Sequence, residues 1–241
     1  MVSVTSGHSG PDPAVGQAPG DLAMLQAFVN TLDVEEGKDE LATPAAMEAW
    51  LRGAGLAAQP AAQPPGQRTE HLAALPAGQP ASGAGPADLA LAVALREALR
   101  AVLRSHVTHR TARTAGAAGP AGTAGPAGPA RPQADPSSAA AAQLAEIAGR
   151  LQARLTADDS GAVRVLAGDS GSRAGLARLL LIAADAATLG TWQRLKVCSA
   201  DDCQWAFYDR SPTRSGCWCS MQNCGSRAKS RAYRSRHSRA S

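Results

Sequence analysis

Apolar residues recur at every third or fourth position in five stretches of the chain, the spacing that gives a helix one buried face. The stretches run over 21–32, 43–53, 88–109, 137–155 and 172–190. Asp21 is a suitable N-cap for the first stretch, and Pro44 suits the opening turn of the second. The pattern predicts a mainly α-helical protein.

Short strands are predicted in two places. Residues 156–166 contain a turn-forming Asp-Asp-Ser-Gly sequence followed by alternating valines, which favours a small β-hairpin. Residues 195–197 and 205–208 are rich in β-branched and aromatic side chains and indicate a second hairpin. A final helix is expected over 220–234, with Ser220 as its N-cap.

Three segments are rich in Gly, Pro, Ala and Ser or Gln and lack the periodicity of a packed element. They cover residues 1–20, 57–86 and 111–136. We expect the first to be disordered and the other two to be low-complexity insertions in a helical domain spanning 21–190. The rest of the chain divides into a small module, 191–236, and a tail, 237–241.

Composition adds a charge asymmetry to this picture. Only 3% of the residues are aromatic, so the expected core is built on Leu, Ala and Val. The formal net charge is +4, and from Thr191 onward ten Lys or Arg face three Asp, which favours an anionic partner for that end. Without a long apolar run or a signal-like start, the chain is expected to be cytoplasmic and to have no membrane partner.

All five cysteines lie in the basic end, and four of them form two pairs. Four residues separate Cys198 from Cys203 and Cys219 from Cys224, and fifteen lie between the pairs. Two thiolates from each of two tight turns make the tetrahedral set that Zn²⁺ prefers. We therefore predict one zinc ion, with a structural role because four thiolates leave no open coordination position.

Spacing alone leaves two alternatives open for the cysteines. They are free thiols or a disulfide-linked tail, although a reducing cytoplasm favours metal binding. Alternatively, Cys217 replaces Cys219 as a zinc ligand, since the two cysteines are separated by a single residue.

The sequence around the cysteines has further distinctive features. It reads Leu195-Lys196-Val197-Cys198, then Cys203-Gln204-Trp205-Ala206-Phe207-Tyr208-Asp209-Arg210-Ser211, and later Cys224-Gly225-Ser226-Arg227. These residues resemble the CGNR zinc-finger family, named for a Cys-Gly-Asn-Arg tetrapeptide in which Ser226 here replaces the Asn. The resemblance favours Cys219 over Cys217 as a ligand. It also implies a bacterial protein of a kind proposed to regulate transcription under stress.

A second resemblance lies near the start of the chain. The run Phe28-Val29-Asn30-Thr31-Leu32 is followed by a short helix ending in Trp50-Leu51. This arrangement is similar to the beginning of the ABATE domain, the usual N-terminal companion of the CGNR finger. The two resemblances occur in the family's order, which implies a transcription regulator with both parts in one chain.

The final helix carries the residues expected to bind nucleic acid. Helical periodicity places Arg227, Arg231 and Arg234 on one face, where they can neutralise phosphates. Lys229 lies to the side of this face, and Tyr233 can lie against a sugar or base. We therefore predict DNA binding. The alternatives are a solvated basic tail, a module docking an acidic protein surface, and RNA binding.

Other polar residues suggest weaker hypotheses. Asn30, with Arg96 of the long helix, is a candidate lining of a pocket for a small-molecule effector, although polar residues at helix ends more often bond nearby backbone. His106 and His109 are expected to be surface histidines. The sequence has no phosphate-binding glycine loop, His-Glu-x-x-His motif or recognisable nucleophile with its base, which predicts no enzymatic activity.

Overall fold

The computed structural model describes residues 16–56, 83–115, 136–151, 153–157, 163–167 and 171–237. Helices dominate these residues, and their strands form small antiparallel hairpins. The prediction of a mainly α-helical protein is confirmed. Residues 1–15, the end of the tail (238–241) and most of both predicted insertions (57–82 and 116–135) lie outside the described residues.

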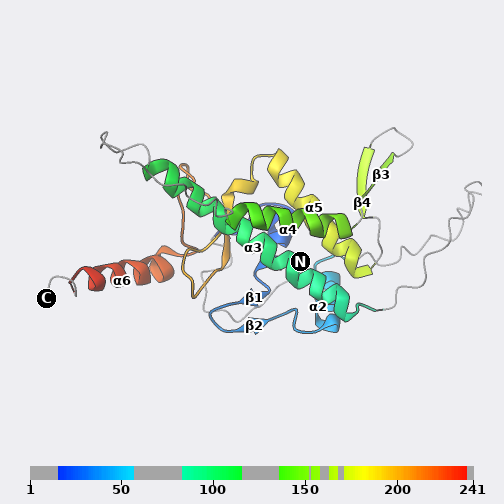
Figure 1. Ribbon diagram of the computed structural model, residues 1–241, viewed down its shortest axis with the longest axis horizontal. Helices are drawn as coiled ribbons and strands as arrows, with labels where there is room; N and C mark the ends of the chain where they lie inside the picture. The colour runs from blue at the N-terminus through cyan, green and yellow to red at the C-terminus, as the bar shows by residue number, and fades with distance from the viewer. Residues whose placement is uncertain are drawn as a thin grey trace, which may run out of the picture.

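The described elements are helices, short helical turns and antiparallel hairpins. The helices are α1 (Leu22–Val29), α2 (Pro44–Gly53), α3 (Pro86–Ala115), α4 (Pro136–Arg150), α5 (Gly171–Thr188) and α6 (Ser226–His237), with a 3₁₀ turn η1 (Trp192–Arg194) and a π turn η2 (Met221–Gly225). The hairpins pair β1 (Leu32–Asp33) with β2 (Lys38–Asp39), β3 (Ala153–Ala157) with β4 (Val163–Ala167), and β5 (Leu195–Val197) with β6 (Ala206–Tyr208). Figure 1 shows α4 beside α3, and α6 extending away from the body.

The structure corrects two predicted helix ends. Helix α3 continues through residues 111–115, which composition assigns to an insertion, because neither Gly nor Pro interrupts them. The helix expected to reach residue 155 ends at Arg150, and the following residues form β3. Leu155 lies opposite Val165 in β4, so strand pairing overrides the helix preference of these residues.

Helix starts are set locally: Pro44 lies in the opening turn of α2 and Ser220 caps η2, both as predicted. The Thr43 hydroxyl accepts a hydrogen bond from the Ala46 amide (3.1 Å) at the start of α2. The Ser220 hydroxyl accepts one from the Asn223 amide (3.2 Å) at the start of η2. Asp21 occupies the N-cap position of α1 but makes no capping hydrogen bond. Its predicted role as a cap is therefore wrong.

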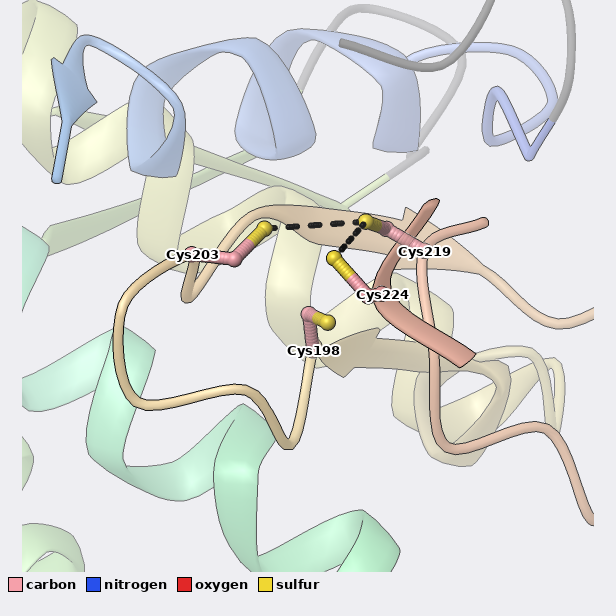
Figure 2. A group of neighbouring side chains, drawn as sticks. All are labelled: Cys198, Cys203, Cys219 and Cys224. Carbon is pink, nitrogen blue, oxygen red and sulfur yellow. Dashed lines mark hydrogen bonds between the residues drawn. The ribbon is translucent and has the colours of Figure 1, made fainter. Parts of the chain in front are cut away.

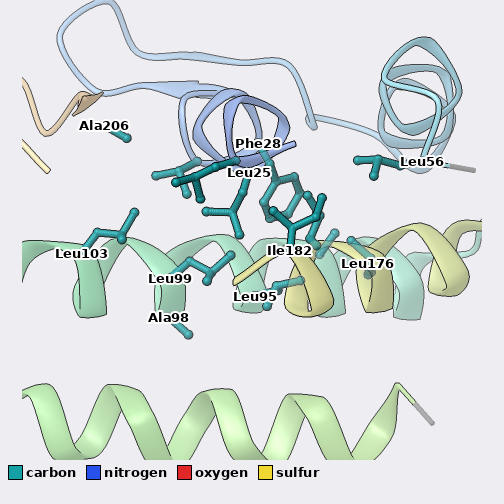
Figure 3. Packing of buried hydrophobic residues seen from close by; sticks show 14 of the residues in the cluster. Leu25, Phe28, Leu56, Leu95, Ala98, Leu99, Leu103, Leu176, Ile182 and Ala206 are labelled. Carbon is teal, nitrogen blue, oxygen red and sulfur yellow. The ribbon is translucent and has the colours of Figure 1, made fainter. Parts of the chain in front are cut away.

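The main core lies between α1, α3 and α5, whose buried side chains point toward one another (Figure 3). They include Leu25, Phe28, Leu95, Leu99, Leu176 and Ile182. Each such Leu or Phe contributes about 1.5–3 kcal/mol relative to an exposed position. Ala98 points from the other side of α3 toward α4 (Figure 3), where a small side chain permits close packing.

The β5–β6 hairpin connects this core to the cysteine-rich end. Its residues Leu195, Val197, Ala206 and Tyr208 are buried in the main core. Phe207 belongs to a second buried cluster, which contains the four paired cysteines. Because neighbouring strand residues face opposite sides, β6 contributes to both clusters. The cysteine-rich module is thus continuous with the helical body.

Polar side chains from α1 and from its C-cap residue, Asn30, bind the edge of β6. Asn30 Nδ2 donates to the Ala206 carbonyl (3.0 Å), and its Oδ1 accepts from the Ala206 amide (2.7 Å). Gln26 donates to the same carbonyl (3.1 Å) and to that of Gly16 (3.0 Å). The Gly16 carbonyl also accepts from the Tyr208 amide (2.6 Å). Residues 16–18, which composition assigns to a disordered start, are instead held along β6.

Asn30→Ala is expected to lower the free energy of unfolding by about 1–3 kcal/mol, because the Ala206 amide loses its partner in a part-buried site. Denaturant unfolding of the zinc-saturated protein measures this. Gln193→Ala removes an exposed amide side chain in η1 and should change the stability by less than about 0.5 kcal/mol. Equal losses in the two variants would show that the pairing with β6 does not stabilise the fold.

Candidate metal centre

Cys198 and Cys203 lie at the two ends of a tight turn between β5 and β6. The Cys198 amide donates to the Trp205 carbonyl (2.9 Å), which extends the strand pairing up to the first cysteine. The amides of Cys203 and Gln204 both donate to the Ala200 carbonyl (3.0 Å each), and Gln204 has a φ of 53°. The turn is therefore closed by backbone hydrogen bonds, which fix the separation of its two sulfurs.

Cys224 lies in η2, the π turn that leads into α6. The Gly225 amide donates to the Ser220 carbonyl (3.0 Å), and this wide turn returns the chain toward Cys219. A Cβ at Gly225 would lie 2.8 Å from the Met221 sulfur, so the position requires glycine unless Met221 moves. These local contacts place the second pair of cysteines opposite the first.

The four paired sulfurs converge in one buried cluster (Figure 2). They lie within 4.8 Å of one another, and Cys219 Sγ is 3.6 Å from Cys203 Sγ and 3.7 Å from Cys224 Sγ. Thiolates bound tetrahedrally to zinc at about 2.3 Å would be roughly 3.8 Å apart. Donor type, number and spacing all fit a four-cysteine zinc site. Cys217 is partly exposed and lies outside this group.

Close packing perturbs the pKa values of these thiols. Hydrogen bonds with Cys203 and Cys219 lower the pKa of the Cys198 thiol to about 2. The hydrogen bond with Cys198 raises the pKa of Cys203, and the hydrogen bonds with Cys198 and Cys203 raise the pKa of Cys219. Protons and a divalent cation therefore compete for the same sulfurs, and binding of zinc as a four-thiolate complex must release protons.

A buried ion pair supports the loop that leads to Cys219. Lys196 Nζ donates to Asp209 Oδ2 (2.7 Å) and to the carbonyls of Arg214 (2.6 Å) and Gly216 (3.0 Å). Asp209 accepts from the amides of Ser211 (2.9 Å) and Gly216 (2.8 Å). Burial raises the pKa of the Asp209 carboxyl, but hydrogen bonds from Lys196 and Ser211 outweigh it and bring the pKa to about 2.

Sequence reasoning did not single out this ion pair. The usable signal is an Asp directly after an apolar strand, in a segment with several cations, because a carboxylate at such a position needs a partner when it is buried. The side chains of Lys196 and Asp209 are 2% and 4% exposed, so the pair is part of the interior of the module.

Arg227, predicted to contact phosphate, is engaged by the protein itself. Its Nη2 donates to Cys224 Sγ (3.3 Å), and its Nη1 donates to Glu35 Oε1 (2.7 Å). The hydrogen bonds to Glu35 and Cys224 raise the pKa of the Arg227 guanidinium. Ser226, which stands in place of the family Asn, donates to the Met221 carbonyl (3.1 Å) and closes the π turn.

The other predicted nucleic-acid residues lie on the exposed part of α6. Arg231 Nη1 is 3.6 Å from Asp202 Oδ2, in the turn of the first cysteine pair. Lys229 and Arg234 are exposed. Tyr233 is 57% exposed, and its ring lies against that of His237, with 4.0 Å between the centroids. These residues thus all lie on α6, which projects from the body, although they do not all share one face of the helix.

Asn30 and Arg96 have separate protein partners in the structure. The Asn30 side chain binds β6, whereas Arg96 is 2% exposed and donates to both carboxylate oxygens of Asp39 (2.7 and 2.8 Å) and to the Thr31 hydroxyl (3.2 Å). The hydrogen bond from Arg96 lowers the pKa of the Asp39 carboxyl. An effector pocket at these two residues stays a prediction.

His106 contacts the cysteine-rich module and is partly exposed. Its Nδ1 donates to the Leu195 carbonyl (2.8 Å), and its ring packs edge-on against Trp192, with 5.4 Å between the centroids. His106 is therefore a partly exposed histidine that is held against the module rather than a freely solvated one. The side chain of His109 lies outside the described part of the structure.

Comparison with known families agrees with the geometry of the cysteine cluster. The sequence model of the CGNR zinc finger matches residues 194–237, which include all four clustered cysteines. The model of ABATE, whose description is "Putative stress-induced transcription regulator", matches residues 22–191, more than half of the chain. The chain belongs to the ABATE family. No curated protein matches it.

In this ABATE-family protein, Cys198, Cys203, Cys219 and Cys224 make up a zinc site, as both the family match and the sulfur geometry indicate. Neither family description names a catalytic activity. Within the described residues, no helix combines the length and apolar character that crossing a membrane requires.

Proposed function

We propose that this ABATE-family protein binds DNA through α6 and acts as a zinc-finger regulator of transcription. The charge of α6 supports this most directly, because the helix carries five Lys or Arg and no Asp or Glu. The helix extends from the zinc module away from the body (Figure 1), so a nucleic-acid backbone can approach it. A helix that is polar all round gains little by packing on its own protein, and a charged partner accounts for its composition.

The basic side chains of α6 divide into two groups. Arg227 is bound to Glu35 and Cys224, so we assign it no phosphate contact. Lys229 and Arg234 are exposed and are the first candidates for phosphate contacts. Arg231 can exchange Asp202 for a phosphate, since an exposed ion pair contributes only about 0–1 kcal/mol.

Tyr233 adds an aromatic surface to the same helix. The residue is 57% exposed, and its ring lies against that of His237, which holds it in place next to basic side chains. Rings in such surroundings stack on sugars or bases and tolerate many sequences. We therefore assign Tyr233 a supporting contact and no role in sequence readout.

An acidic protein surface is the second candidate partner. Two arginines of α6 already bind carboxylates in this structure, Arg227 with Glu35 and Arg231 with Asp202. Acidic side chains of another protein would suit the same guanidinium groups. Phosphate binding weakens steeply with salt, whereas a protein interface persists better, so a salt series separates the two partners.

We propose that any effector acts on the helical part, residues 21–190, and that residues 191–236 carry the nucleic-acid contact. Asn30 supports this division because it binds β6 directly. A ligand that displaced Asn30 from Ala206 would act on the zinc module without passing through another element. Arg96 is a weaker candidate for an effector contact, since its side-chain nitrogens already bind Asp39, Thr31 and Glu97.

Duplex DNA binding across a salt series tests the proposal on the zinc-loaded protein. Lys229→Ala/Arg234→Ala should weaken binding and reduce the slope of log K against log salt by about 1.8, roughly 0.9 for each lost phosphate contact. Arg52→Ala/Arg178→Ala is the matched control, because it removes two exposed positive charges from α2 and α5 instead. The control should leave the slope unchanged.

Two results would count against DNA binding by α6. Failure of the unchanged protein to bind at low salt would remove the basis of the proposal. An equal change of slope in the control would assign the binding to net charge rather than to α6. Competition by an RNA duplex of the same length then decides between the two nucleic acids, since the 2′-hydroxyl and the helix form distinguish them.

A further inference from the structure

Arg227 lies between a zinc ligand and the helical body. Its Nη2 donates to Cys224 Sγ at 3.3 Å, and the same nitrogen is 3.4 Å from Glu35 Oε2. Its Nη1 donates to Glu35 Oε1 at 2.7 Å, so the guanidinium faces the carboxylate with two nitrogens. The Arg227 side chain is 38% exposed, and its Nε is buried. Arg227, the arginine of the family tetrapeptide, therefore makes its described contacts with other residues of the same chain.

A hydrogen bond from Arg227 suits the charge of the zinc site. Four thiolates around a divalent ion leave a net charge of about −2. A cationic donor beside one of the sulfurs offsets part of that charge. Arg227 is at the position where such a donor is needed, one turn after Cys224 on the helix that follows it.

The backbone of Glu35 is held in place by contacts that do not involve Arg227. It lies in the turn between β1 and β2, where Asp33 Oδ1 accepts from the amides of Glu35 (2.9 Å) and Glu36 (3.0 Å). Asp33 is itself buried. The hairpin is tied to α3 through Asp39, which binds both terminal nitrogens of the buried Arg96. The carboxylate of Glu35 is thus presented to the zinc module by the helical body.

Arg231 provides the comparison within the same helix. It lies one turn after Arg227 and also approaches a carboxylate, Asp202, at 3.6 Å. Its side chain is 50% exposed, and its described contact is with this carboxylate rather than with a ligand sulfur. The two arginines therefore differ in the feature that matters for the metal, the hydrogen bond to Cys224.

We propose that Arg227 is a positioning residue of the zinc site and that Glu35 of the β1–β2 turn aims it at Cys224. Zinc affinity then depends on a carboxylate 192 residues before the arginine it orients. The zinc site in turn holds the start of α6 against the helical body. The proposal concerns zinc binding alone and does not depend on whether α6 binds DNA.

Competition with a colorimetric zinc chelator measures the affinity in the full-length protein. Arg227→Gln is expected to weaken zinc binding about 10–100-fold, the usual effect of removing a partner of a metal ligand. Arg227→Lys keeps the positive charge but lacks the planar guanidinium with its several donors, so it should weaken zinc binding less than Arg227→Gln does. Glu35→Gln should weaken binding on the order of fivefold. Arg231→Gln, the matched control, should bind zinc as the unchanged protein does.

The double variant shows whether Glu35 acts through Arg227. If it does, Glu35→Gln/Arg227→Gln binds zinc no more weakly than Arg227→Gln alone, because the carboxylate has nothing left to orient. Losses that add would mean that the two residues act separately and would overturn the positioning role. A loss in Arg231→Gln equal to that in Arg227→Gln would assign the effect to the net charge of α6.

Cobalt(II) offers a readout that depends on the ligand sulfurs. The thiolate absorption of the cobalt-loaded protein should shift in Arg227→Gln and Glu35→Gln and stay unchanged in Arg231→Gln. Unchanged affinity and spectra in both variants would overturn the proposal. If Arg227→Gln does not fold, Glu35→Gln decides the question, since it leaves every residue of the zinc module in place.

Discussion

Cys203→Ser is expected to leave the protein without stoichiometric zinc, because a neutral hydroxyl does not replace a thiolate and three cysteines leave an open coordination position. Structural zinc contributes about 10–16 kcal/mol to small zinc fingers near neutral pH, so the part of the protein built on the metal should unfold with its loss. Metal analysis after gel filtration measures the zinc content, which should fall from one ion per chain to almost none.

The unfolding caused by Cys203→Ser should stay within the zinc module. The cysteines form a cluster with Phe207 that is separate from the main core, whereas Leu195 and Val197 are buried among the helices. Far-ultraviolet circular dichroism should therefore lose the contribution of η2 and α6 and keep most of its helical signal. Complete loss of helical signal would show that the helical body depends on the metal as well.

Cys217→Ser is the matched control for the zinc ligands. It makes the same change two residues before Cys219, at a partly exposed thiol outside the sulfur cluster. We expect it to bind zinc at full stoichiometry, and Cys219→Ser to bind none. The opposite result, loss of zinc in Cys217→Ser and retention in Cys219→Ser, would assign the fourth ligand to Cys217.

Features encoded over a few residues could be predicted from the sequence. The cysteine pairs are close in the chain, so their spacing predicts two turns that carry metal ligands, and the family resemblance selects Cys219 over Cys217. The cap at Ser220 is equally local, since its hydroxyl accepts from an amide three residues later. In such cases the residues that decide the structure are neighbours, and tertiary contacts add little to the outcome.

Features that depend on distant partners could not be predicted in the same way. Residues 153–155 are predicted as a helix end, but their pairing with 165–167 makes them part of a strand. From the sequence, Asn30 is an ordinary polar residue at a helix end. Its partner is the backbone of Ala206, 176 positions later, which the sequence does not indicate. Helical periodicity places Arg227 correctly on α6, but it contains no information on the contacts of its guanidinium with Glu35 and Cys224.

Lys196→Met is expected to lower the free energy of unfolding of the zinc-loaded protein by about 3–5 kcal/mol, because it leaves a buried carboxylate without its cation. Lys196 and Asp209 are 2% and 4% exposed, and the ammonium also holds the carbonyls of Arg214 and Gly216. Denaturant unfolding at saturating zinc measures the loss. Exposed Lys38→Met, in the β2 strand, is the control and should change the stability little.

Asp209→Asn tests the same pair from its other side, and the double variant isolates their interaction. Removing both charges should destabilise the protein by less than the sum of the single changes, because the double variant leaves no unpaired buried charge. The pKa of Asp209 is lowered from 3.8 to about 2, so its stabilising effect is complete above about pH 4 and is lost only as the pH falls toward 2. The effect of Lys196→Met should therefore be the same throughout roughly pH 6–8, and a strong pH dependence in that range would mean that the carboxylate is not the partner that matters.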